Sequence, residues 1–137
     1  MRVVFDTNVY ISAFGIPGSK SEDAFLLTLK EEMNLFISVS ILTEIANVLK
    51  NKFKFSNEII QTTLKYISQI ARVIKPQRSI KVLKDEPDNR ILECAIEAKA
   101  DFIVTGDKHI KQLNEYKGIK IVSVSEFLEL ASQYKIK

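Results

Sequence analysis

Four acidic side chains are placed so that they could act together. Asp6 directly follows an apolar run at residues 3–5, which has the length and the β-branched and aromatic content of a buried strand. Glu44 lies in the first turn of the helix predicted after the next strand, Asp88 begins a further helix, and Asp107 follows a later strand. In a parallel sheet covered by helices, these positions come out at the carboxyl ends of the strands, where such sheets bind ligands.

Carboxylates gathered at one edge repel one another, and such a group persists mainly where a divalent cation neutralises it. Oxygen ligands without a set of Cys or His favour Mg2+ or Mn2+ over zinc, and this chain has one Cys and one His. Each acid taken alone has a simpler explanation, as a turn residue, a helix cap or a solvated residue near a helix start. Their shared position favours a metal site.

The rest of the chain supplies elements that would position these acids. Short apolar runs predict strands at residues 3–5, 35–37, 73–74, 102–105 and 119–122. Helical spacing predicts helices at 21–33, 41–50, four turns from 56, 89–100, 109–114 and a last one after 123, with N-caps at Ser19, Ser40, Ser56 and Ser123. Strands that alternate with helices predict a parallel sheet with right-handed crossovers.

Length and composition predict one soluble domain over residues 1–137. The hydrophobic fraction of 46% and the charged fraction of 27% are ordinary for a globular protein, and no apolar run approaches the roughly 20 residues of a membrane span. We expect no secretory leader, and the single Cys94 fits a reducing cytoplasm. The net charge of +3 permits a nucleic-acid partner without requiring one.

The motifs resemble those of a PIN domain, in the group of VapC-like toxin components of toxin-antitoxin systems. The resemblance covers nearly the whole chain and rests on an ordered set of four motifs. They are Val-Val-Phe-Asp6-Thr-Asn8-Val, Ser-Ile-Leu-Thr-Glu44-Ile, Asp85-Glu-Pro-Asp88-Asn89-Arg-Ile-Leu-Glu-Cys-Ala and Phe-Ile-Val-Thr105-Gly-Asp107. The resemblance implies a three-layer α/β/α fold of the α/β class, with a five-stranded parallel sheet in the order 3-2-1-4-5.

The resemblance also implies a metal-dependent ribonuclease. One or two ions of Mg2+ or Mn2+ would be held by residues that are also the catalytic ones: Asp6, Glu44, Asp88 and Asp107. Four further residues match supporting positions of the family: Asn8, Thr105, Asp85 and Asn89. Whether Asp85 contacts the metal stays open, and so does the role of Asn89. The sequence departs from many relatives at Glu86-Pro87, where Pro-Asp is common, which should move the loop more than the ligands.

A bound cation would invert the negative field of the acids and activate a water for attack on an RNA phosphodiester, leaving a 5′-phosphate. Candidate RNA-binding residues are Lys52, within a run of alternating Lys and Phe, Lys108, and above all Arg90, which lies close in sequence to Asp88. The lysines could equally form a solvated connection. His109 is most simply a solvated residue, and Cys94 a small core residue.

Two other classes of function stay open. A phosphohydrolase or receiver-like domain could use Asp6 as a phosphoryl acceptor, but Asn8 stands where a second acid is expected, and no glycine-rich phosphate loop is present. A catalytically silent PIN module could bind only RNA or a partner protein. The resemblance further implies a small antitoxin partner and a homodimer.

Overall fold

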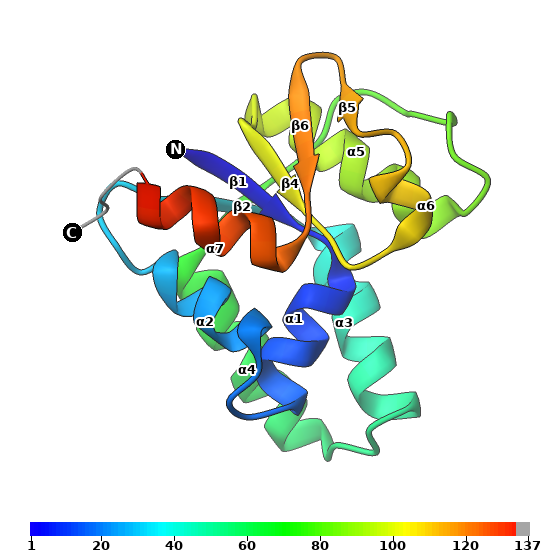
Figure 1. Cartoon of the computed structure of the whole chain (residues 1–137). Coiled ribbons are helices and arrows are strands. Elements are labelled where there is room, and N and C mark those ends of the chain that lie inside the picture. Colours follow the sequence, from blue (N-terminus) through cyan, green and yellow to red (C-terminus); the bar gives the residue numbers. More distant parts are fainter. Residues whose placement is uncertain (134–137) are drawn as a thin grey trace.

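The computed structural model describes residues 1–133, and the last four residues of the predicted domain lie outside the described part. Within residues 1–133 the sheet has six strands in the order β3-β2-β1-β4-β6-β5 (Figure 1). Neighbouring strands are parallel except β5 and β6. The strands are β1 (Arg2–Phe5), β2 (Asn34–Ser38), β3 (Arg72–Ile74), β4 (Phe102–Val104), β5 (Glu115–Tyr116) and β6 (Ile119–Val122).

The five predicted strands are present, parallel and in the predicted order, but the expected total of five is wrong because β5 adds a sixth. This strand has only two residues and pairs antiparallel with β6. Lys117 and Gly118 turn the chain between them, both with positive φ, at 49° and 86°. Two residues are too few to show an alternation of apolar and polar side chains, so no sequence pattern predicts this strand.

The helices within residues 1–133 confirm the alternating pattern but correct several of its boundaries. They are α1 (Thr7–Gly15), α2 (Lys20–Leu27), α3 (Val39–Asn51), α4 (Asn57–Ile70), α5 (Glu86–Ala98), α6 (Lys108–Lys111) and α7 (Val124–Gln133). Helix α1 was not predicted, and α5 begins three residues earlier than expected. Ser38 caps α3 in place of Ser40, so Glu44 lies in the second turn of that helix and not in the first.

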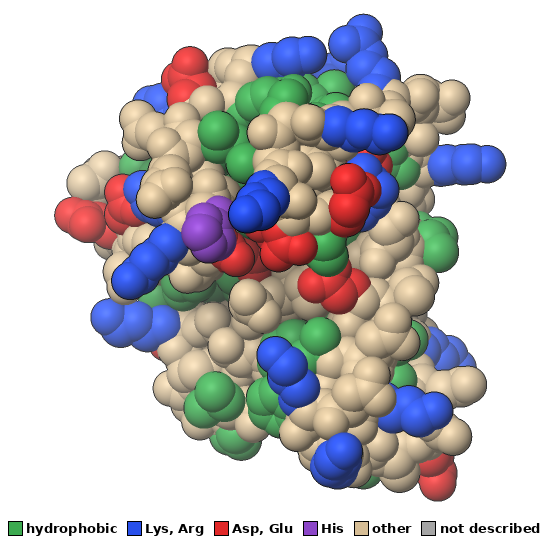
Figure 2. Space-filling view, turned by 90° about the vertical axis from the view of Figure 1, so that its right-hand side faces the viewer, with side chains coloured by type: hydrophobic (Ala, Val, Ile, Leu, Met, Phe, Trp, Pro, Cys, Tyr) green, Lys and Arg blue, Asp and Glu red, His purple; other side chains and the backbone are tan. Residues whose placement is uncertain are grey.

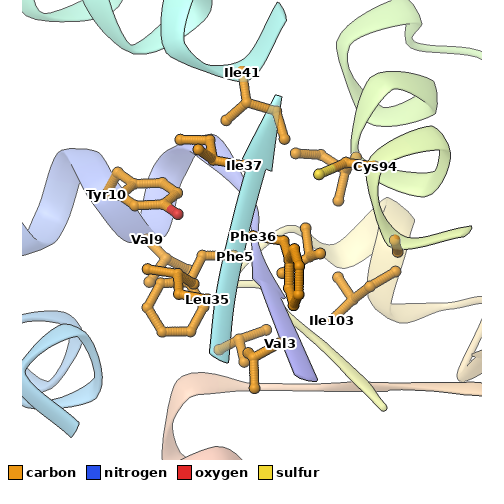
Figure 3. Packing of buried hydrophobic residues seen from close by; sticks show 14 of the residues in the cluster. Val3, Phe5, Val9, Tyr10, Leu35, Phe36, Ile37, Ile41, Cys94 and Ile103 are labelled. Carbon is orange, nitrogen blue, oxygen red and sulfur yellow. The ribbon is translucent and has the colours of Figure 1, made fainter. Parts of the chain in front are cut away.

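The sheet separates two layers of helices, with α1, α2 and α7 on one side and α5 and α6 on the other (Figure 1). Strand β1 is central, and its three apolar residues have no exposed surface. Phe5 packs against Tyr10 of α1 and Phe127 of α7, at ring-centre distances of 5.7 and 5.8 Å. Phe36 and Ile103 point to the opposite side, towards α5 (Figure 3). This two-sided core fixes the carboxyl ends of the strands.

No helix within residues 1–133 has the length and apolar character that crossing a membrane requires.

Replacing the two candidate N-cap residues of α3 distinguishes the observed helix start from the expected one. Ser38 is buried, and its Oγ accepts a hydrogen bond from the Ile41 amide at 3.3 Å. We expect Ser38→Ala to lower the free energy of unfolding by about 1 kcal/mol. Ser40 is exposed within the helix, so Ser40→Ala should change it by less than about 0.5 kcal/mol. Urea denaturation of both variants measures this, and equal losses would contradict it.

Candidate active site

Asp6 lies at the junction of β1, β4 and α1. Its amide donates to the Val104 carbonyl at 3.0 Å, which continues the pairing of the two strands. Its Oδ1 accepts from the Val9 amide at 3.1 Å and so caps α1, while its Oδ2 accepts from the Thr105 hydroxyl. The same hydroxyl oxygen accepts from the Asp107 amide at 2.8 Å. Thr105 therefore ties two of the predicted acids together, which is the supporting position expected for it.

Asp107 caps the short helix α6. Its Oδ1 accepts hydrogen bonds from the amides of His109 and Ile110, at 2.7 and 3.3 Å. These two hydrogen bonds confirm that Asp107 caps the helix. Capping alone, however, does not require the carboxylate to lie near other carboxylates. The capping explanation for Asp107 and the site explanation are thus both compatible with the structure.

Asp88 lies in the first turn of α5 and is 8% exposed. Its Oδ2 is buried and has no hydrogen-bond partner within the described part of the chain. Asp85 precedes the helix as its N-cap residue but makes no side-chain capping bond. A buried carboxylate oxygen without a donor is costly, so Asp88 is not explained as a capping residue.

The four acids act on one another electrostatically. Burial raises the pKa of Asp88 to about 6, and the charges of Asp107, Asp85, Asp6 and Glu44 add to the rise in that order. Such interactions fade with distance and with solvent. The charges of Asp6, Glu44 and Asp107 therefore all reach Asp88, and so does that of Asp85.

The pKa values of Asp6 and Glu44 are also raised by burial and by neighbouring carboxylates. Burial raises the pKa of Asp6 to about 6; the Thr105 and Val9 hydrogen bonds oppose this rise, and the charge of Asp107 adds to it. Burial also raises the pKa of Glu44, which is half-buried on α3, with contributions from Asp6 and Asp85. The charges that raise the pKa values of Asp6, Glu44 and Asp88 are those of other carboxylates. A bound cation would therefore relieve their mutual repulsion.

The side chains do not form a ready coordination shell. Within residues 1–133, no three Asp, Glu, His or Cys side chains are close enough to hold a metal ion as they stand. The residues nevertheless fit a hard divalent cation, because all the donors are carboxylate oxygens and Asp88 Oδ2 is buried without a partner. Binding would therefore require these side chains to move closer together.

A pocket of about 580 Å³ opens beside the acids. Figure 2 shows acidic side chains gathered in a hollow of this face, with the histidine and several basic side chains around it. The lining residues are Leu83, Lys84, Asp85, Asp88, His109 and Gln112. Sequence reasoning treated His109 as solvated and did not single out Leu83, Lys84 or Gln112. The one available signal was that His109 follows Asp107 by two residues.

The other predicted site residues differ in their burial and in their contacts. Asn89 is fully buried, and its amide side chain binds the main chain of Leu83 twice: Oδ1 accepts from N at 2.8 Å and Nδ2 donates to O at 2.9 Å. Lys108 lines a second hollow beside Asp107. Asn8 is exposed on α1, and Lys52 is exposed at the end of α3.

Arg90 is held by its own helix and the preceding loop. Its guanidinium contacts Glu93 at 2.9 Å and Glu86 at 3.4 Å, and it donates to the Ile80 carbonyl at 3.3 Å. Glu93 also accepts from the Ile80 amide at 2.8 Å. These contacts favour a role in positioning the loop, and they reduce what the guanidinium could offer to RNA.

Comparison with known proteins identifies the family. A family model described as PIN domain matches residues 2–109. The chain belongs to the PIN domain family. An uncharacterized protein of Methanocaldococcus jannaschii is 34% identical over 145 residues, covering 94% of this chain and 90% of that protein.

Two solved structures share the PIN fold of this chain. One is VapBC2 from Rickettsia felis bound to a DNA fragment from their promoter, with a TM-score of 0.63 and 19% identity over 90% of this chain and 98% of that one. The other is VapBC-1 from nontypeable Haemophilus influenzae, with a TM-score of 0.63 and 17% identity over 91% and 99%. At this identity the likeness shows the fold alone.

The stability of the metal-free PIN domain should depend on pH through Asp88. Its pKa is about 6 in the folded protein, against 3.8 ordinarily, so the folded state binds a proton that the unfolded state releases between these values. Stability is therefore greater below about pH 4 and is lost as pH rises through about 6. We expect Asp88→Asn to gain stability relative to the parent across this window, measured by urea denaturation in chelator. Asp23→Asn, an exposed control, should track the parent.

Millimolar Mg2+ or Mn2+ should raise the melting temperature at pH 7, because a cation that binds only the folded cluster shifts unfolding by mass action. Differential scanning calorimetry of the parent, Asp88→Asn and Asp23→Asn measures the effect. The rise should shrink in Asp88→Asn and persist in Asp23→Asn. An equal rise in all three proteins would place the cation elsewhere.

Proposed function

We propose that this PIN domain is a metal-dependent endoribonuclease, a VapC-like toxin component that hydrolyses RNA phosphodiester bonds. Membership of the PIN family and the fold shared with two VapBC structures support this proposal. The observation that carries it is the buried, unpartnered Oδ2 of Asp88 in the field of four other carboxylates. An acid cluster held against its own repulsion is typical of a site selected for function and not for stability.

The four acids would hold one or two ions of Mg2+ or Mn2+: Asp6, Glu44, Asp88 and Asp107. When bound, the cation neutralises the acids and supplies Lewis-acid chemistry for hydrolysis at phosphorus. Thr105 keeps the Asp6 carboxylate in place and accepts from the Asp107 amide. The capping bond to Val9 restrains the other oxygen of Asp6. These two hydrogen bonds preorganise the Asp6 carboxylate, whereas the buried Oδ2 of Asp88 has no such partner.

Positive side chains beside the acids would bind the RNA backbone. Lys108 and Lys111 line the hollow next to Asp107, and Lys84 lines the larger pocket. We keep Lys52 and Arg90 as weaker candidates, Arg90 because its guanidinium is already bound to Glu86 and Glu93. Binding through such groups should weaken with salt.

The proposal extends to partners. A small antitoxin protein and a homodimer fit a VapC-like toxin in the cytoplasm, and the two structures with a similar fold are those of VapBC2 and VapBC-1. A catalytically silent PIN module that binds RNA or a partner protein is the second candidate. It is favoured by one observation: within residues 1–133, no three potential ligands are positioned to hold a metal.

Cleavage should require a divalent cation and should leave 5′-phosphate and 3′-hydroxyl ends. The chain has one histidine, so no histidine pair is present for cyclising the 2′-hydroxyl. End-labelling of products from varied RNAs, with Mg2+, Mn2+ or a chelator, checks this. Cyclic 2′,3′-phosphate ends would contradict the mechanism, and parent protein without turnover on any RNA would favour the silent module.

In the same assay, Asp6→Asn and Asp88→Asn should each lower the cleavage rate more than the roughly 10- to 100-fold that follows loss of an outer partner of a metal ligand. The matched control is Asp23→Asn on α2, which is exposed and should cleave like the parent. A variant that keeps both its activity and its metal response would remove that residue from the site.

A further inference from the structure

The pocket beside the acids is larger than a metal site needs. Its volume of about 580 Å³ falls within the range of about 300 to 1,000 Å³ that small-molecule sites occupy. Two segments line it, residues 83–88 and helix α6. Asp88, whose buried Oδ2 has no hydrogen-bond partner, belongs to the same lining. The pocket therefore adjoins the proposed reaction centre and leaves room for a further group of the substrate.

The first of these segments is held rigidly to α5. Asn89, with no exposed surface, binds both the amide and the carbonyl of Leu83, at 2.8 and 2.9 Å. A paired contact of this kind fixes the direction of the main chain as a neighbouring strand would. Upstream, Ile80 is bound by Glu93 and Arg90. The Leu83 side of the pocket is thus formed before any ligand arrives.

Helix α6 is anchored at two points. The Asp107 carboxylate caps its first amides, at 2.7 and 3.3 Å, and Ile110 is 1% exposed and packs in the core. His109 and Gln112 are exposed and line the pocket. Because they are three residues apart, they lie on one face of the helix. An aromatic ring and a carboxamide are therefore presented together next to Asp88.

This lining suits a neutral aromatic ring better than a second phosphate. Two negative charges in the lining, Asp85 and Asp88, would repel an anion that entered the pocket, and the single positive charge of Lys84 offsets only part of this repulsion. An uncharged heterocycle meets no such penalty. Nucleobases stack on aromatic side chains, His among them, and pack on apolar ones. Leu83 and His109 supply such surfaces, and Gln112 can both donate to and accept from the edge of a base.

We propose that this pocket is a nucleobase subsite, in which Leu83 and His109 contact one base of the RNA and Gln112 binds its edge. The inference rests on the proposed function for the identity of the polymer, and it adds that the chain selects the nucleotide beside the scissile bond. His109 and Gln112 are then specificity-determining residues, and Asn89 is a positioning residue for Leu83.

The single histidine provides a direct test by proton NMR. At fixed pH and with a chelator present, the His109 ring signals are followed during titration with adenosine, guanosine, cytidine and uridine 5′-monophosphates. Stacking of a base shifts these signals upfield in a saturable way. Ribose 5-phosphate and inorganic phosphate are the controls that lack a base. The expected result is a base-dependent shift that differs among the four nucleotides.

Two variants that are neighbours in sequence separate the pocket from the loop that carries it. Leu83→Ala should weaken binding of the preferred nucleotide about 5-fold or more, because the base then loses the apolar surface on which it packs. Val82→Ala is the matched control, because Val82 is exposed and is not part of the lining; its affinity should equal that of the parent. Thermal melting shows whether Leu83→Ala still folds. If it does not, His109→Ala, at an exposed position, takes its place, and its nucleotide affinity is measured from the backbone amide signals.

The inference is overturned if no signal shifts, if ribose 5-phosphate produces the same shift, or if Val82→Ala loses affinity as Leu83→Ala does. Sequencing of cleavage ends from a randomised RNA provides a second arm: His109→Ala should lose nucleotide preference at one position next to the cut, and His109→Phe should retain a preference. Nucleotide binding without cleavage would reject only the nuclease proposal. Cleavage without base-dependent shifts or altered preference would reject only the subsite.

Discussion

Asp6 imposes the constraint on which the rest of the structure depends. It follows the strand at which the sheet order reverses, with β2 on one side of β1 and β4 on the other, the point where open α/β sheets bind ligands. Its amide continues the pairing with Val104, one oxygen starts α1, and the other accepts from Thr105. A single buried carboxylate therefore sets the strand ends, the first helix and the support of Asp107.

Burying that carboxylate is possible because the core around it is rigid. Strand β1 has no exposed apolar surface, and aromatic contacts with Tyr10 and Phe127 hold Phe5 directly before Asp6. A close-packed interior resists the small shifts that would relieve charge repulsion. Burial, and to a smaller extent the neighbouring carboxylates, raises the pKa of both Asp6 and Asp88. Apolar packing thus holds in place a cluster that electrostatics alone would disperse.

The strands, and the positions of Asp6 and Asp107 shortly after two of them, were predictable from sequence because both depend on short-range patterns. Buried parallel strands are continuous apolar runs, and an acid after such a run must lie at the carboxyl edge. Helix α1 was missed because it follows β1 without a polar loop, and Asp6 ends one element while it caps the next. Strand β5 was missed because two residues carry no period. Ser40 was predicted as the N-cap of α3 in place of Ser38, because Ser38 is also the last residue of β2.

The contacts that shape the pocket could not be predicted, because they join side chains to the main chain of an irregular loop. Nothing in the sequence pairs Asn89 with Leu83, or Arg90 with Ile80. The Arg90 contacts also bear on the charge of the site. Its two terminal guanidinium nitrogens already contact the carboxylates of Glu86 and Glu93, so this positive charge, although close in sequence to Asp88, is paired elsewhere. The helix that supplies Asp88 thereby fixes the loop and leaves the acid cluster negative, which is the condition for binding a divalent ion.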